Sequence, residues 1–251
     1  MIILYIILSI FILLLIWHFT TLKYRNPYKF YFYFGKKGVG KSTFLARIAY
    51  ENLKKGRKVY SQEVMSFKIR FKPFHKKEFV STLPIQAYYI YNNPFPDGSV
   101  ILIDEASLLW SNRDFADRRK TDSMRKTIEW FQQQRKHKCI VHMFSVSFDI
   151  DKKLRDLCDE MYIVNKVLRV WTVARHVVRK PVIVHPQGDA PASIQDDIIE
   201  DGLLLAPFGG MRITFIPKWA KYFDTYREVV AGSSESPSSP LSTIRSGSSS
   251  L

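Results

Sequence analysis

The first 22 residues form one continuous hydrophobic segment, MIILYIILSIFILLLIWHFTTL, which contains no Asp, Glu, Lys or Arg. As a helix, it would span about 33 Å at 1.5 Å per residue, which is sufficient for the hydrocarbon core of a membrane. A signal peptide would begin with basic residues and end in small ones, and a buried core helix would carry a polar face. Because neither pattern is present, we expect residues 1–22 to form a transmembrane helix.

Basic residues follow this segment directly, at Lys23, Arg25 and Lys29. Positive charges concentrate on the cytoplasmic side of membrane helices. The sequence therefore predicts a single-pass protein of the inner (cytoplasmic) membrane, with its amino terminus outside and the rest of the chain in the cytoplasm.

After residue 28, the apolar positions follow the periods of strands and helices in turn. The aromatic run at residues 29–34 predicts a buried strand, and residues 41–55 carry a helical apolar stripe that ends before Gly56. The run VILI at 100–103 is typical of a strand buried on both faces. Such alternation predicts an α/β fold with a largely parallel sheet. Further strands are expected at residues 58–62, 86–92, 139–147, 161–166 and 167–178, and further helices at 121–136 and 150–160.

The pattern changes toward the end of the chain, which suggests four parts. Residues 28–165 hold the alternating strands and helices, and residues 166–230 are mostly β-like and contain prolines, as expected of a small β-rich extension. The last 21 residues, 231–251, include ten serines and almost nothing apolar, so we expect them to be disordered. With the helix at 1–22, these are the predicted domains.

Charge and cysteine content narrow the classes of partner and site. The chain carries 38 Lys and Arg against 23 Asp and Glu, a net charge of +15 that favours an anionic partner. Membrane headgroups, nucleic acid and nucleotide phosphates all satisfy this condition. The only cysteines, Cys139 and Cys158, form no CxxC pair, so neither a disulfide framework nor a zinc site is indicated.

The stretch GKKGVGKS at residues 35–42 matches G-x-x-x-x-G-K-[ST] between a predicted strand and a predicted helix. Glycines let the backbone turn its N–H groups toward phosphate oxygens, and the following helix directs its positive end at the same anion. A glycine-rich turn without a ligand is the alternative, and the flanking strand and helix argue against it. The predicted ATP-binding residues are Gly35, Lys36, Lys37, Gly38, Val39, Gly40, Lys41, Ser42 and Thr43.

Within this motif, Lys41 is expected to reach the β- and γ-phosphates, and the Ser42 hydroxyl is expected to bind Mg²⁺. The stretch VILIDEAS at 100–107 supplies the complementary carboxylates. Asp104, at the tip of the strand, is predicted to hold Mg²⁺ directly or through a water. Glu105 is predicted to orient or deprotonate the attacking water. The alternative is a strand end whose acidic residues merely face solvent.

Two further residues are candidates for catalysis. Ser147, at the end of the predicted strand 139–147, could contact the γ-phosphate or the water, or could be an ordinary strand-end hydroxyl. Arg155 could act as an arginine finger toward a neighbouring subunit, or could be a solvated helix residue. The guanine-reading motif N-K-x-D is incomplete, because residues 165–168 end in Leu168, so a GTPase is disfavoured.

A basic segment remains without a role. Residues 51–80 carry nine Lys and Arg against three Glu, interleaved with phenylalanines. This composition fits a surface that faces nucleic acid or lipid, or simply a solvated face. The stretch RDFADRRK at 113–120 has the same ambiguity.

Taken together, the motifs resemble those of the zonula-occludens-toxin-like (Zot) family, the assembly ATPases of filamentous phages, which are distantly related to FtsK/HerA motors. The segments that carry the resemblance are GKKGVGKS, VILIDEAS, QQQRKHKCIVHMFSVSFDIDKKLRDL (132–157) and KYFDTYRE (221–228). The family's strand-end residue is commonly Gln, where this chain has Ser147. Family members often place the membrane helix after the ATPase domain, whereas here it precedes that domain.

The resemblance implies a P-loop NTPase fold of the RecA/FtsK type and a membrane-anchored enzyme that hydrolyses ATP with Mg²⁺ to drive phage assembly or extrusion. It also implies a homo-oligomer, with single-stranded DNA and phage coat or export proteins as partners. Three alternatives stay open. One is a DNA-translocating packaging or conjugative coupling ATPase, and the second is a membrane scaffold that binds nucleotide as a switch without hydrolysing it. The third is a peripheral lipid-binding protein that uses its basic clusters.

Overall fold

A central sheet organises the chain in the computed structural model, which describes residues 2–21, 26–71, 76–110, 118–148, 150–184, 193–200 and 210–222. The strand order is β10-β9-β8-β1-β7-β6-β2-β5, and β11 also pairs with β9. The strands from β8 to β5 are parallel, while β9, β10 and β11 pair antiparallel. The α/β fold with a mostly parallel sheet is therefore confirmed. The bounds are β1 Phe30–Phe34, β2 Val59–Ser61, β5 Leu83–Pro84, β6 Val100–Ile103, β7 Ile140–Ser145, β8 Glu160–Val167, β9 Trp171–Val184, β10 Ser193–Glu200 and β11 Met211–Phe215.

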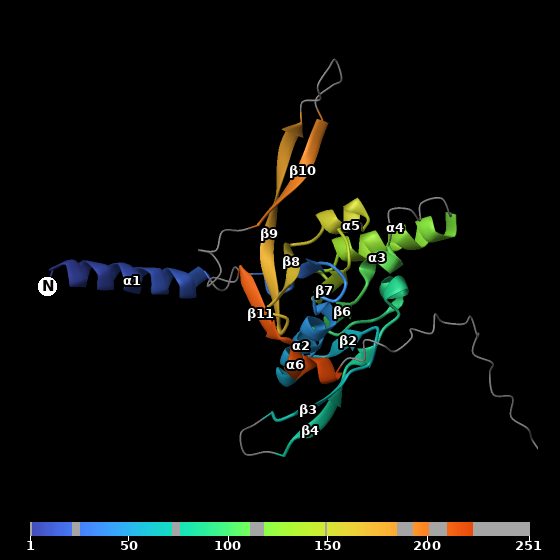
Figure 1. Cartoon of the computed structure of the whole chain (residues 1–251), viewed down its shortest axis with the longest axis horizontal. Helices are drawn as coiled ribbons and strands as arrows, with labels where there is room; N and C mark the ends of the chain where they lie inside the picture. Colours follow the sequence, from blue (N-terminus) through green and yellow to red (C-terminus); the bar gives the residue numbers. More distant parts are fainter. Residues whose placement is uncertain are drawn as a thin grey trace, which may run out of the picture.

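Helices cover both faces of the sheet. Helix α2 (Lys41–Lys54) packs on one face, and α4 (Arg118–Gln132) packs on the other together with the short helices α3 (Ala106–Leu109) and α5 (Lys152–Asp156) (Figure 1). In β6, Ile101 and Ile103 join the apolar core under α4, whereas Val100 and Leu102 join the core under α2. Since both faces of β6 are buried, its four residues read as an uninterrupted apolar run.

Helix α1 (Ile2–Thr21) extends away from the sheet (Figure 1). Its side chains from Tyr5 to Thr21 are exposed. Within the described ranges, no helix has both the length and the hydropathy that crossing a membrane requires. The prediction of a transmembrane helix over residues 1–22 is thus not supported by the structure.

Several elements differ from their sequence-based predictions. Residues 86–92, expected as a strand, contain the 3₁₀ helix η2 (Ala87–Asn92), which lies against α4 and buries Ala87 and Ile90. The spacing of three between those two side chains suits a 3₁₀ turn, so packing overrode the strand preference of the aromatic residues. The helix expected at 150–160 is confined to α5, because Glu160 already belongs to β8. The strand expected at 139–147 ends at Ser145.

The chain after residue 165 continues the same sheet. A turn in which Leu168 and Arg169 have positive φ joins β8 to β9, and β10 and β11 pair with β9. Helix α6 (Ile216–Trp219) and the 3₁₀ helix η5 (Ala220–Tyr222) then pack on α2. The serine-rich segment 231–251 and the pair Asp224–Thr225 lie outside the described residues.

One charged residue fastens β11 to the sheet. The Arg212 guanidinium lies 4.7 Å from the ring centroids of both Tyr31 and Tyr162, and it donates a hydrogen bond of 2.6 Å to the Tyr33 hydroxyl. Its Nη2 is also 3.7 Å from a Glu160 carboxylate oxygen. These contacts hold the strand that precedes α6 against β1 and β8.

Candidate functional site

The loop between β1 and α2 is shaped by its glycines. Gly38 and Gly40 have φ of 80° and 91°, values that side chains rarely tolerate. Gly35 is required for a different reason, because a Cβ there would lie 2.3 Å from the Val164 carbonyl oxygen of β8. The local sequence thus explains a tight loop that rests directly on the sheet.

The start of α2 is open to an anion. Gly40 is the N-cap residue, and no side chain caps the first turn. The amide groups at the beginning of a helix have no partners inside it, and they carry the positive end of the helix dipole. These N–H groups therefore suit phosphate oxygens. Lys36 and Lys37, in the preceding loop, are exposed and add positive charge beside it.

Lys41 closes the loop in this conformation. Its Nζ donates hydrogen bonds to the Gly35 carbonyl at 2.8 Å and the Lys36 carbonyl at 3.1 Å, and the residue is only 8% exposed. Burial lowers the pKa of Lys41, an effect that the negative charges of Asp104 and Glu105 partly oppose. A buried ammonium bonded only to neutral carbonyls is poised to exchange them for an anionic oxygen.

Ser42 and Asp104 come together as predicted for a magnesium site. The Ser42 Oγ donates to the Asp104 Oδ2 at 3.3 Å, and the backbone N–H of Asp104 donates to Gln62 Oε1 at 2.6 Å. Burial raises the pKa of Asp104, while the Glu105 N–H, Lys41 and Ser42 act in the opposite direction. A divalent cation would supply positive charge next to this buried carboxylate.

These two residues fit Mg²⁺ but do not form a complete cage. Across the described ranges, no three His, Cys, Asp or Glu side chains are grouped to hold a metal. Mg²⁺ typically takes one or two protein ligands and completes its shell with phosphate oxygens and water. Ser42 and Asp104 would therefore hold the ion only together with a bound nucleotide.

Glu105 occupies a strained backbone position next to Asp104. Its φ and ψ are 48° and 45°, in the left-handed region, and it is the N-cap of α3. The side chain is exposed, and the backbone N–H donates to Asp104 Oδ1 at 3.0 Å. Such strain in a residue other than glycine concentrates at functional sites. The conformation leaves the Glu105 carboxylate facing solvent beside the candidate Mg²⁺ ligand.

At the end of β7, the structure brings Ser145 into contact with the loop. Ser145 pairs with Phe34, and its carbonyl accepts a hydrogen bond of 3.3 Å from the Gly35 N–H. The Ser145 hydroxyl is buried and has no hydrogen-bond partner among the residues that the structure describes. Ser147 lies two residues beyond the strand end and is exposed. The role of Ser147 stays a prediction, whereas Ser145 is a contact that sequence reasoning missed.

Arg155 is folded onto its own segment. Its guanidinium lies 4.1 Å from the centroid of the Phe148 ring, and Nη1 donates to the Phe148 carbonyl at 3.0 Å. An arginine finger needs its guanidinium free to reach another subunit's nucleotide. Arg155 would have to leave Phe148 to act in that way, and its role stays a prediction.

A second missed contact comes from β9, far along the chain. Thr172 is buried, and its Oγ1 donates to the Val39 carbonyl at 2.9 Å and lies 3.5 Å from the Gly40 carbonyl. Thr43 binds the same loop through a hydrogen bond of 2.7 Å to the Gly40 carbonyl. The loop is therefore held from α2 and from β9. No local signal in the sequence pointed to Thr172, since the contact depends on the pairing of β8 with β9.

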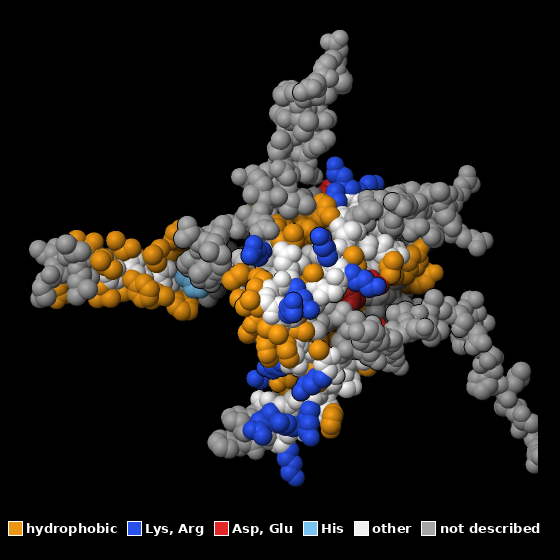
Figure 2. Space-filling view, in the orientation of Figure 1, with side chains coloured by type: hydrophobic (Ala, Val, Ile, Leu, Met, Phe, Trp, Pro, Cys, Tyr) orange, Lys and Arg blue, Asp and Glu red, His pale blue; other side chains and the backbone are white. Residues whose placement is uncertain are grey.

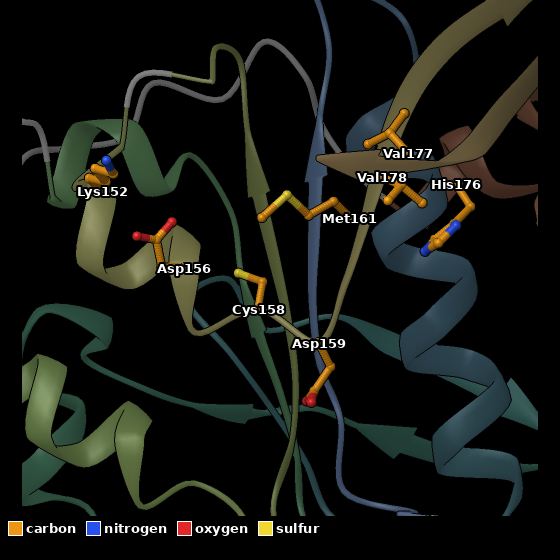
Figure 3. Close-up of a pocket in the computed structure, with 8 residues that line it drawn as sticks. All are labelled: Lys152, Asp156, Cys158, Asp159, Met161, His176, Val177 and Val178. Carbon is orange, nitrogen blue, oxygen red and sulfur yellow. The ribbon is translucent and has the colours of Figure 1, made fainter. Parts of the chain in front are cut away.

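A separate cavity of about 550 Å³ lies between α5, β8 and β9 (Figure 3). It lies near the amino-terminal end of the parallel strands, because Glu160 at the start of β8 pairs with Tyr31 near the start of β1. The candidate nucleotide site lies at the carboxyl end of these strands, and none of its residues lines the cavity. The lining residues are Lys152, Asp156, Cys158, Asp159, Met161, His176, Val177 and Val178.

Comparison of the chain with known protein families shows the class of protein to which this site belongs. The family model that describes the ATPase family associated with various cellular activities (AAA) matches residues 31–166, more than half of the chain. The chain belongs to the AAA family. The prediction of a P-loop NTPase is thereby confirmed, and the AAA domain contains the loop at 35–42 together with Asp104 and Glu105.

Three of the solved structures that match this chain are the following. The N-terminal domain of zonular occludens toxin from Neisseria meningitidis is 16% identical, with a TM-score of 0.46 over 78% of this chain and 99% of that chain. The ATPase domain of G40P is 10% identical, with a TM-score of 0.40 over 68% and 81%. A DnaB-like replicative helicase, solved in a study of its interactions with primase, is 13% identical, with a TM-score of 0.39 over 67% and 54%.

The first of these structures is a zonular occludens toxin, and the sequence motifs of this chain resemble those of the Zot family. No curated protein sequence matches this chain.

Proposed function

We propose that this chain hydrolyses ATP in a Mg²⁺-dependent reaction. The observation that carries the proposal is the convergence of four groups at one end of the sheet: the open start of α2, the Lys41 ammonium, the Ser42–Asp104 pair and the exposed Glu105 carboxylate. They offer donors for phosphate, ligands for a divalent cation and a base in adjacent positions.

Each residue has a distinct part in this proposal. Lys41 would exchange the Gly35 and Lys36 carbonyls for phosphate oxygens, and Ser42 and Asp104 would hold the cation. Bound Mg²⁺ neutralises phosphate charge. Glu105 would orient a water and take its proton, as its position beside Asp104 allows.

Replacing Glu105 by Gln tests the hydrolytic step. A general base contributes roughly 10²- to 10⁴-fold, so Glu105→Gln should lower kcat for ATP by at least about 100-fold while a fluorescent ATP analogue still binds. Glu129→Gln removes an exposed carboxylate from α4 and serves as the matched control. Equal turnover in the unmodified protein and Glu105→Gln would contradict the catalytic assignment and favour a nucleotide-binding scaffold.

We place this hydrolysis in the assembly or extrusion of a filamentous phage, because the sequence motifs resemble that family of motors. Under this proposal the chain works as a homo-oligomer, with single-stranded DNA and coat or export proteins as partners. A DNA-translocating packaging or coupling ATPase is the second candidate, and its turnover would respond to DNA in the absence of any coat protein.

Membrane association through α1 belongs to the same proposal. The helix exposes a run of large apolar side chains; Ile6, for example, is 53% exposed and Phe19 is 66% exposed. Exposed apolar surface of this extent indicates an apolar partner. The full chain should therefore float with lipid vesicles, and a variant that lacks residues 1–22 should not. Equal flotation of the two proteins would contradict attachment through α1.

A further inference from the structure

A small hairpin stands outside the central sheet. Strands β3 (Ser66–Ile69) and β4 (Glu78–Ser81) form their own two-stranded antiparallel sheet. The hairpin projects from the body on the side opposite to the β9–β10 pair (Figure 1), and lysine and arginine side chains gather at this end of the molecule (Figure 2).

The two faces of the hairpin differ in character. On the inner face, the buried Phe67 ring packs against Tyr50 of α2 and Tyr222 of η5, with centroid distances of 5.9 and 4.8 Å. Ile69 is buried on the same face. These contacts fasten the hairpin to the body and fix which side of it remains outside.

The outer face combines cations with one exposed ring. Lys68 and Phe79 are register partners, with the Lys68 Nζ 5.3 Å from the centroid of the Phe79 ring. Phe79 is 77% exposed, and Arg70, Lys76 and Lys77 are exposed nearby in the chain. A ring in water with cations around it is an arrangement that core packing does not require.

We propose that this outer face binds single-stranded nucleic acid. Proteins that bind single strands combine cations that contact the phosphates with aromatic rings on which bases stack. Lys68 and Arg70 provide the first function and Phe79 the second. A lipid surface is the alternative anionic partner, but the neighbouring Ser66 and Ser81 hydroxyls, 2.8 Å apart, interrupt the apolar area that insertion into a membrane would need.

The base of the hairpin is joined to the candidate ATP site. Gln62, four residues before β3, accepts the Asp104 N–H at 2.6 Å. The hairpin closes directly after it, because the Met65 N–H donates to Thr82 Oγ1 at 2.9 Å and Thr82 N–H returns a bond of 2.9 Å to the Met65 carbonyl. The Ser61 Oγ donates to the same threonine oxygen at 2.7 Å. A nucleic-acid strand bound to the hairpin would therefore act close to Asp104. This coupling between the hairpin and the candidate ATP site rests on the proposed ATPase function.

Fluorescence anisotropy of a labelled 20-nucleotide dT oligomer with the full chain tests the binding. Since stacking contributes about 1–3 kcal/mol per base, Phe79→Ala should weaken binding about 5- to 150-fold, and Phe79→Tyr should retain it. Each phosphate that a cation neutralises adds about 0.7 to the slope of log K against log salt. Lys68→Gln/Arg70→Gln, which removes two such cations, should therefore reduce that slope by about 1.4.

Lys136→Gln/Lys166→Gln provides the matched control, because it removes two exposed charges outside the hairpin. If this control weakens binding as much as the hairpin double variant, net charge alone explains the affinity and the proposal is overturned. Vesicles of anionic lipid form the second arm, in which the variant that lacks residues 1–22 separates binding by the hairpin from binding by α1. If Phe79→Ala reduces binding to vesicles but not to dT, the face binds lipid and the proposal is likewise wrong. An rU oligomer of equal length shows whether DNA or RNA is preferred.

ATP turnover separates this inference from the proposed function. Phe79→Ala should retain turnover in the absence of nucleic acid, and it should lose any increase that the dT oligomer causes in the unmodified protein. If the chain binds dT through Phe79 but hydrolyses no ATP, the proposed function is wrong and the hairpin assignment stands. If the chain hydrolyses ATP but Phe79→Ala binds dT equally well, the hairpin assignment is wrong and the proposed function stands.

Discussion

The contact between Gly40 and β9 provides the sharpest test of how the phosphate-binding loop is held. A Cβ at position 40 would lie 2.2 Å from Thr172 Oγ1, whereas such atoms ordinarily stay about 3.4 Å apart. In Gly40→Ala, the Thr172 hydroxyl must therefore withdraw by about 1 Å, which breaks its hydrogen bond to the Val39 carbonyl.

The cost of Gly40→Ala has two sources. Holding alanine at a φ of 91° costs roughly 1–2 kcal/mol, and losing the Thr172–Val39 hydrogen bond costs roughly 1 kcal/mol. The free energy of unfolding should fall by about 2–3 kcal/mol. Thr172→Ala should cost about 1–2 kcal/mol alone. In the double variant the hydrogen bond is lost only once and the clash is relieved, so the total should be about 1 kcal/mol smaller than the sum of the single effects.

Urea denaturation of the four proteins without nucleotide measures this coupling, and binding of a fluorescent ATP analogue follows the loop itself. Thr172→Val is the control, since its methyl group occupies the position of the hydroxyl and preserves the clash. Gly40→Ala/Thr172→Val also loses the hydrogen bond only once but keeps the clash, so it should be less stable than Gly40→Ala/Thr172→Ala. If the Gly40→Ala/Thr172→Ala pair is additive to within about 0.5 kcal/mol, β9 does not hold the loop and the reasoning is refuted.

Three other predictions concern buried charge. Burial raises the pKa of Asp104 above 3.8, so the folded state binds a proton more tightly than the unfolded state, and stability without Mg²⁺ should fall as pH rises through the raised pKa. The loss amounts to about 1.4 kcal/mol for each unit by which the pKa is raised, and Asp104→Asn should abolish it in urea titrations with EDTA. The same variant should abolish Mg²⁺-dependent turnover. An unchanged pH profile of stability in Asp104→Asn would contradict the burial argument. Arg212→Met should cost about 1–3 kcal/mol, because the buried Tyr33 hydroxyl loses the cation that donates to it while Glu160 keeps only its ion pair with Lys29, and a loss below about 0.5 kcal/mol would show that Arg212 does not fasten β11. The pKa of His142, lowered first by burial and then by Arg212, should rise in that variant when followed by NMR.

The local chemistry of the site was readable from the sequence. The glycine loop, Lys41 at the first position of α2 and Asp104 after β6 all follow from short-range rules on turns, helix starts and buried strands. Each of these features depends on residues adjacent in the chain. For that reason the period of apolar positions predicted the bounds of β6, and nearly those of β1 and α2.

Short-range rules did not predict which residue at the end of β7 contacts the loop. Ser145 and Ser147 have the same local pattern, and only the register of β7 with β1, which pairs Ser145 with Phe34, decides which serine meets Gly35. In the same way, nothing near Arg155 in the sequence indicated that its guanidinium would rest on Phe148.

The sequence alone determined that the chain has a phosphate-binding loop, paired carboxylates and an alternating α/β order, because these are properties of neighbouring residues. Only the tertiary structure decided that Gln62 fixes Asp104, that Thr172 holds the loop from β9, and that Phe79 faces water while Phe67 is buried. Those contacts depend on which strands pair and which hairpin face meets the core. Such choices minimise the exposed apolar area of the whole fold, and no local pattern specifies them.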